Sequence, residues 1–177
     1  ECNRDSLAYH TRLYPDIADR FHFFRNCVDT DFYRPLAPDE RDAARARWTS
    51  SLGLAPSTRF VAFAGRLQPT KNVALLLDAW SRLRVVGAHL LIAGDGNLGP
   101  SLRGHASSLG IADQVSFLGA VEPVVVRELL QCSEVLAIPS THEGLPMIAL
   151  ASTWLWCRGI RLPPRPDVYS RFGQPTS

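Results

Sequence analysis

Two cations stand in one short stretch of the chain, where a run of apolar residues gives way to polar ones. Residues 61–65 read Val-Ala-Phe-Ala-Gly, Arg66 follows directly, and Lys71 comes five positions later. Lys71 is the single lysine among the 19 Lys+Arg residues. A guanidinium binds phosphate oxygens as a rigid fork, and an ammonium acts as a compact point charge. The pair therefore suits two adjacent phosphates, although two solvated surface cations would give the same pattern.

A second group of residues that could bind a ligand occupies positions 139–146, which read Pro-Ser-Thr-His-Glu-Gly-Leu-Pro. An apolar helix start follows at Met147, and backbone N–H groups at the start of a helix attract anions. Gly144 lets a ligand approach the backbone closely, and Glu143 can accept hydrogen bonds from sugar hydroxyls. Alone, the pattern describes a capped helix. On one edge with Arg66 and Lys71, it predicts a pocket for pyrophosphate and sugar.

The elements that would position these residues follow from the alternation of apolar runs and helical periodicity. Strands are predicted at 60–64, 88–93, 115–118 and 134–138, and helices at 73–84, 100–109 and 123–132. Before them, residues 1–30 predict a helix and a short strand at 22–26, and a polar helix is expected to begin at Asp39. Strands that alternate with helices indicate an α/β fold with a doubly wound, Rossmann-like parallel sheet.

Ligands of such sheets bind at the carboxyl ends of the strands. Those ends carry Gly65-Arg66, Gly94-Asp95-Gly96, Gly119 and residues 140–143, all on one predicted rim. Residues 94–99 also fit the G-x-G-x-x-G pattern of nicotinamide cofactor sites. That fingerprint belongs to the first strand-to-helix turn and needs an acidic residue closing the next strand, which is missing here. A tight turn before a helix explains these glycines better.

Composition limits the alternatives. The 177 residues are 46% hydrophobic and 20% charged with a net charge of +2, which gives no reason to expect a nucleic acid partner. The four cysteines are widely spaced and the histidines are scattered, so we expect free thiols, a cytoplasmic location and no metal site. No secretory signal or membrane span is predicted.

Five blocks of the sequence together resemble the donor-binding half of retaining GT-B glycosyltransferases of the family 4 (group 1) type. The blocks are 26–35, Gly65-Arg66-Leu67 with Lys71, 94–96, 115–121 and 139–146. In that family two Rossmann-like domains face each other across a cleft, so the resemblance implies an incomplete, C-terminal half of the architecture. It divides the chain into a remnant of the N-terminal acceptor-binding domain (1–30), a linker with a connecting helix (31–58), a truncated nucleotide-sugar-binding domain (59–150) and an atypical tail (151–177).

The resemblance also implies a reaction, the transfer of a hexosyl group from a nucleotide-diphosphate sugar to an unknown acceptor with retention of configuration. Its implied catalytic residues are Arg66 and Lys71, which hold the diphosphate, and Glu143, which contacts the transferred sugar. The other implied donor-binding residues are Gly65, Gly94, the base-binding backbone at Leu118, Gly119 and Val121, and the phosphate-binding amides of Gly144 and Leu145. No metal or other cofactor is implied. The implied acceptor is a sugar, a lipid or a small molecule. Any association with a membrane surface would involve the missing N-terminal domain.

Two departures from the family pattern qualify these expectations. A second glutamate is expected eight positions after Glu143 to hold the ribose, but Ala151 stands there. After Leu150 the chain turns to tryptophans, prolines and arginines, as if the reading frame were lost near Ala151 or the end had diverged. We therefore expect the isolated chain to be an inactive fragment. The alternative is a non-catalytic module that binds a nucleotide sugar or a nucleotide.

Overall fold

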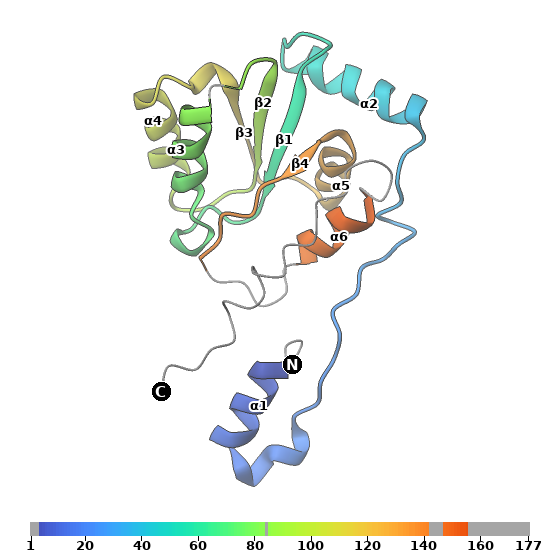
Figure 1. The fold of residues 1–177 in the computed structure, drawn as a ribbon, viewed down its shortest axis with the longest axis vertical. Coiled ribbons are helices and arrows are strands. Elements are labelled where there is room, and N and C mark those ends of the chain that lie inside the picture. Colours follow the sequence, from blue (N-terminus) through green and yellow to red (C-terminus); the bar gives the residue numbers. More distant parts are fainter. Residues whose placement is uncertain (1–3, 84, 142–146, 156–177) are drawn as a thin grey trace.

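A parallel sheet of four strands forms the centre of the structure, a computed structural model that describes residues 4–83, 85–141 and 147–155 (Figure 1). The strands lie in the order β3-β2-β1-β4. Their bounds are β1 (Arg59–Ala64), β2 (Ala88–Ala93), β3 (Val115–Gly119) and β4 (Val135–Leu136). Because the chain moves outward from β1 to β3 and then returns to the other side of β1, the order reverses between β1 and β4.

Helices cover both faces of this sheet, which confirms the predicted doubly wound α/β fold. One face carries α3 (Val73–Leu83) and α4 (Gly99–Ser108), and the other carries α2 (Pro38–Ser51) and α5 (Pro123–Cys132). α6 (Met147–Leu155) packs against α5. The described residues also include three short 3-10 turns: η1 (Pro15–Arg20), η2 (Pro69–Lys71) and η3 (Ala112–Gln114).

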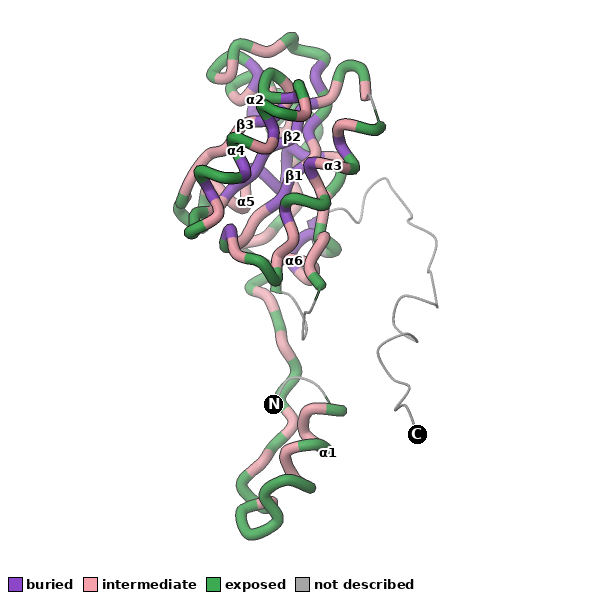
Figure 2. The backbone as a smooth tube through the Cα atoms, turned by 90° about the vertical axis from the view of Figure 1, so that its left-hand side faces the viewer, coloured by how far each residue is buried: buried purple, intermediate pink, exposed green. Residues whose placement is uncertain are grey.

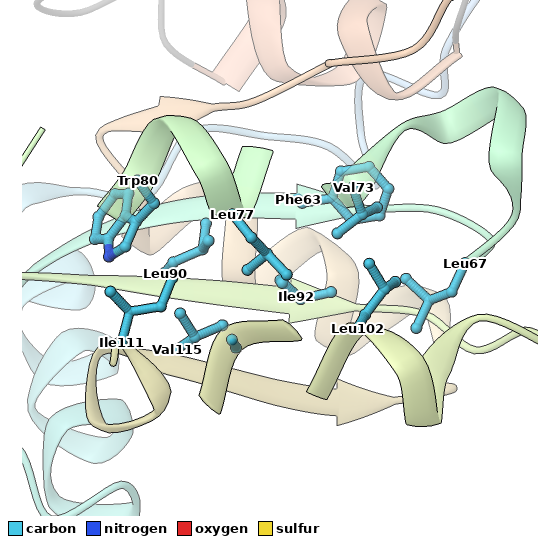
Figure 3. Packing of buried hydrophobic residues seen from close by; sticks show 11 residues of the cluster. Phe63, Leu67, Val73, Leu77, Trp80, Leu90, Ile92, Leu102, Ile111 and Val115 are labelled. Carbon is cyan, nitrogen blue, oxygen red and sulfur yellow. The ribbon is translucent and has the colours of Figure 1, made fainter. Parts of the chain in front are cut away.

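Strand β2 shows why the sheet needs helices on both sides. Leu90 and Ile92 are buried in the cluster under α3 and α4, while Leu91 and Ala93 are buried in the cluster under α2 and α5. Successive side chains of a strand point to opposite faces, so a strand without polar alternation must be covered twice. In Figure 3 the first cluster extends from Trp80 and Ile111 at one end to Leu67 at the other.

Two predictions about local structure were wrong. Residues 22–26 form no strand, and β4 covers two residues where five were predicted. β4 pairs with β1 through Val61 to Val135 and Ala62 to Leu136. The residues before and after β4 still follow the path of a strand, because Glu134 donates to Phe60 over 2.9 Å and Ala137 donates to Ala62 over 2.8 Å.

Helix α1 (Arg4–Leu13) stands apart from the sheet and its helices, at the end of an extended segment (Figure 1). It has no buried residue, and Figure 2 shows the buried positions concentrated around the strands instead. Tyr9 and Leu13 are 61% and 51% exposed. The part of the chain that builds the core therefore begins after this helix.

Two of the predicted domain boundaries separate parts of the chain that share the core. α2 lies in the segment predicted as a linker, yet its Ala44 is 1% exposed and packs in the same cluster as Phe60 and Leu91. α6 continues across position 150 and buries Ala151 and Leu155 against Leu130 of α5. The four-part division of the chain stays a prediction.

Candidate functional site

The loop that follows β1 is fixed to the loop that follows β2. The N–H of Gly65 donates to the carbonyl of Ala93 and that of Leu67 to the carbonyl of Asp95, both over 2.9 Å. The Leu67 side chain is 3% exposed and packs in the α3/α4 cluster. Arg66 lies between these two anchored positions with its side chain exposed. The backbone that carries the guanidinium is thus held by the sheet, while the charged group faces outward.

Gly94 makes this close approach possible. A Cβ atom built on Gly94 would lie 1.9 Å from the carbonyl oxygen of Gly65, far inside van der Waals contact. Its φ of 140° is also unfavourable for residues other than glycine. The N–H of Gly94 donates to the carbonyl of Gly119 over 2.7 Å, which joins the loop after β3 to the same assembly. Gly96 is similar, because its Cβ would lie 2.4 Å from the carbonyl oxygen of Leu67. Loop packing thus accounts for both glycines without a nicotinamide cofactor.

Two clefts open at this edge of the sheet, one on each side of the end of β1. The larger, of about 410 Å³, lies between the ends of β1 and β2 and the residues that follow β3. The smaller, of about 190 Å³, lies between the end of β1 and the segment that follows β4. Ala64 lines both. The smaller cleft therefore occupies the point where the strand order reverses, the position at which doubly wound sheets bind ligands.

The larger cleft combines an apolar wall with charged residues. Arg66 and Asp95 line it, and its apolar lining includes Ala120, Val121 and Val126. The Asp95 carboxylate accepts the N–H of Gly96 over 2.7 Å, so it also shapes its own loop. Such a mixture suits a ligand with a flat, weakly polar part and an anionic part.

Lys71 lines the smaller cleft together with Ser140 and the first residues of α6, Met147 and Ile148. It is the last residue of η2, and its N–H donates to the carbonyl of Gln68 over 3.0 Å. Asn72, which follows, has a φ of 50°, a left-handed conformation that asparagine tolerates better than most residues. This residue turns the chain from η2 directly into α3.

The structure brings most of the predicted site residues to one edge. Gly65, Arg66, Gly94 and Val121 line the larger cleft, and Lys71 lines the adjoining one. Gly119 joins them through its hydrogen bond to Gly94.

The remaining predicted residues are not placed in a cleft. The side chain of Leu118 packs in the α2/α5 cluster, so only its backbone could meet a ligand there. Glu143, Gly144 and Leu145 lie outside the described residues.

Several residues that line the clefts were not among the predicted site residues. Asp95 was placed on the predicted rim with Gly94 but was assigned no role. Ser140 lies directly after the β4 segment, and its position at a strand end also placed it on that rim, without a role in the site. Val126 and Ile148 belong to apolar helix patterns that indicate a core equally well. Both are partly buried in the cluster between α5 and α6 as well as lining a cleft.

Ala151 replaces the glutamate that the family pattern leads one to expect. Its side chain is 1% exposed, on the face of α6 that packs against Leu130. A methyl group there contributes to packing and offers no hydrogen-bond acceptor to a ribose.

Within residues 4–83, 85–141 and 147–155, no three His, Cys, Asp or Glu side chains are grouped as a metal ion would require. The prediction that the protein works without a metal stays a prediction. Over the same described ranges, no helix has the length and apolar character needed to cross a bilayer.

Comparisons with known proteins converge on one family. Residues 44–153 match the family described as "Glycosyl transferases group 1". A D-inositol 3-phosphate glycosyltransferase of Segniliparus rotundus is 33% identical over 129 residues, which are 70% of this chain and 27% of that protein. The chain therefore spans about a quarter of the length of the curated relatives it matches.

Solved structures share the fold. The crystal structure of Anabaena Alr3699/HepE in complex with UDP and glucose superposes with a TM-score of 0.70 at 19% identity, covering 87% of this chain and 41% of that one. The C-terminal domain of the glycosyl transferase group 1 family protein LpcC from Francisella tularensis superposes with a TM-score of 0.62 at 16% identity, over 72% of this chain and 66% of that one.

Proposed function

We propose that the two clefts of this chain, which belongs to the group 1 glycosyl transferases, bind a nucleoside-diphosphate sugar. From this donor the protein would transfer a hexosyl group to an acceptor with retention of configuration. The observation that carries the proposal is the convergence of Arg66 and Lys71 on the two clefts that meet at the end of β1. A diphosphate that bridges these clefts would meet a cation on each side. The apolar wall at Ala120 and Val121 would then face the base.

In the proposed reaction the bond between the anomeric carbon and the diphosphate oxygen breaks, and an acceptor oxygen bonds to that carbon on the same face. The acceptor hydroxyl passes its proton to the departing diphosphate oxygen. Arg66 and Lys71 would stabilise the negative charge that grows on the leaving nucleotide, an effect that is large where charges are held in place before the reaction. Glu143, predicted to contact the sugar, lies outside the described residues.

Binding measurements test the donor site directly. We expect the chain to bind UDP, GDP or ADP more tightly than the matching monophosphate in calorimetric titrations. Arg66→Gln and Lys71→Met should each weaken diphosphate binding by roughly tenfold, as expected for loss of a charged hydrogen bond. Arg82→Gln, at the end of α3 and remote from the cleft linings, is the matched control. Equal affinity for diphosphate and monophosphate would contradict the proposal.

We further propose that the 177 residues by themselves bind a donor without transferring its sugar. Ala151 supports this, because the ribose would lose a hydrogen-bonding partner worth about 1–3 kcal/mol. The same observation favours a second candidate function, a non-catalytic module that binds a nucleotide sugar. Sugar transfer by the purified chain, measured with radiolabelled donors, would contradict both statements.

A further inference from the structure

The turn that carries Lys71 is held from a second direction by the segment that follows β4. The backbone N–H of Thr141 donates to the carbonyl of Thr70 over 3.0 Å, and the Thr141 hydroxyl approaches the same oxygen at 3.4 Å. Figure 1 shows this segment, in orange, running from β4 toward the loop that enters α3. The two partners are 71 residues apart in the sequence, so the contact joins two separate strand-loop units.

The side chain of Thr70 is also engaged. Its hydroxyl oxygen accepts a hydrogen bond from Gln68 Nε2 over 3.0 Å, across the same short turn. Thr70 thus has its side chain fixed to the start of η2 and its carbonyl fixed to the opposite wall of the smaller cleft. Lys71 is the next residue and Ser140 precedes Thr141, and both line that cleft.

This arrangement determines how far apart the two walls lie. On the other side, Leu67 is anchored to the loop after β2. The loop between Arg66 and Lys71 is therefore tied at both ends, by Leu67 to one unit and by Thr70 to another. An ammonium placed by a tethered backbone loses less freedom on binding a phosphate than one on a free loop, which favours binding.

We propose that Thr70 and Thr141 are positioning residues that set Lys71 against the diphosphate of the donor. They act through Lys71 and touch no reacting atom. The inference rests on the proposed function, since it assigns these residues to the same donor site. It predicts that the second phosphate is recognised less well when Thr70 loses either the hydrogen bond that its hydroxyl accepts from Gln68 or the one that its carbonyl accepts from Thr141. The rest of the nucleotide should bind as before.

The test compares UDP, GDP or ADP, whichever binds tightest, with its monophosphate by calorimetric titration of the full chain. Thr141→Pro removes the donating N–H, and Thr70→Val keeps the branched shape but removes the oxygen that accepts from Gln68. Each should lower diphosphate affinity by roughly two- to tenfold, the range for one net hydrogen bond, with monophosphate affinity unchanged. Thr70→Ser and Thr141→Ser keep the groups concerned and should bind as the parent does.

A double-mutant cycle with Lys71→Met shows whether the threonines act through the lysine. In that background Thr70→Val should have no further effect on diphosphate affinity. Thermal unfolding midpoints accompany each variant. If Thr141→Pro fails to fold, Thr141→Val takes its place, because it removes the hydroxyl that approaches the Thr70 carbonyl.

The outcomes separate the two proposals. A parent chain that does not favour the diphosphate overturns the proposed function, and this inference with it. A parent chain that favours the diphosphate through Lys71, but is unaffected by Thr70→Val and by the Thr141 variant that folds, overturns this inference alone. Equal losses for diphosphate and monophosphate overturn it too, since they would indicate a general structural role.

Discussion

At the scale of single residues, Gly94 is the position where the fold of the site is most sensitive to one added carbon. Gly94→Ala would place a methyl group 1.9 Å from the carbonyl oxygen of Gly65, so the loops after β1 and β2 must separate. We expect a loss of at least about 1–3 kcal/mol of unfolding free energy from backbone strain, and weaker nucleotide binding. Urea unfolding followed by circular dichroism measures the first effect.

The same substitution at Gly104 is the matched control. Gly104 is exposed in α4, and nothing lies within 4 Å of a Cβ built there. Alanine suits a helix interior better than glycine, so Gly104→Ala should stabilise the chain by about 0.5–1 kcal/mol. If both variants changed stability in the same direction, the close approach at Gly94 would not be the cause.

At the scale of elements, β2 and β3 are joined by a buried polar contact that includes a titratable group. His89 is 5% exposed, and its Nε2 lies 2.9 Å from the hydroxyl of Ser116. Burial lowers the pKa of His89 below 6.5, and the nearby Asp113 opposes this only in part. The unfolded chain therefore binds the proton more readily. The contribution of neutral His89 to the unfolding free energy should be fully present above pH 6.5 and should be lost as the pH drops below it.

The variant His89→Gln removes this titration and keeps a group that can hydrogen-bond with Ser116. We expect its unfolding free energy to depend less on pH below 6.5 than that of the parent chain. Urea unfolding series at several pH values compare the two. Parallel curves for both chains would show that His89 does not carry the dependence.

Most strands of the sheet and the helices that cover it could be predicted from the sequence. Strands such as β1 and β2 are largely apolar runs bounded by turn residues, and the helices between them show helical periodicity. The predicted span of β2, 88–93, is the observed one. Residues 22–26 misled the prediction, since apolar and aromatic composition alone does not supply a neighbouring strand with which to pair. Phe24 there is 71% exposed. Strand pairing depends on tertiary structure and cannot be identified from the sequence of a single segment.

The site was predictable to the extent that it depends on strand ends. Gly65, Arg66, Gly94 and Lys71 could be assigned to one edge because parallel strands end together. Its division into two clefts could not, because that depends on how loops distant in sequence pack. The Thr70–Thr141 contact is of this kind, since neither threonine belongs to a periodic pattern.

At the scale of the whole molecule, the described residues form a packed body, which is the sheet with its covering helices, and a protruding helix, α1. α1 buries none of its residues, whereas Val28 and Tyr33 pack against the cluster between α5 and α6. Removing residues 1–25 should therefore change the thermal midpoint of the body by less than about 3 °C, which corresponds to roughly 1 kcal/mol or less. Differential scanning calorimetry of the two chains provides the comparison. A larger drop would mean that α1 stabilises the body.

The hydrogen bonds between the loops also determine which groups would neutralise the charge of the proposed donor. The N–H groups of Gly65, Leu67, Lys71 and Gly94 already donate to backbone carbonyls, so this loop differs from a cradle of open amides around a phosphate. Among the described residues, charge neutralisation would fall to the side chains of Arg66 and Lys71, which salt ions can screen. Diphosphate affinity should therefore decrease steadily as ionic strength rises, and the decrease should be smaller in Lys71→Met. A donor bound as proposed would meet backbone N–H groups that are already engaged, so its affinity would depend on the surrounding salt concentration.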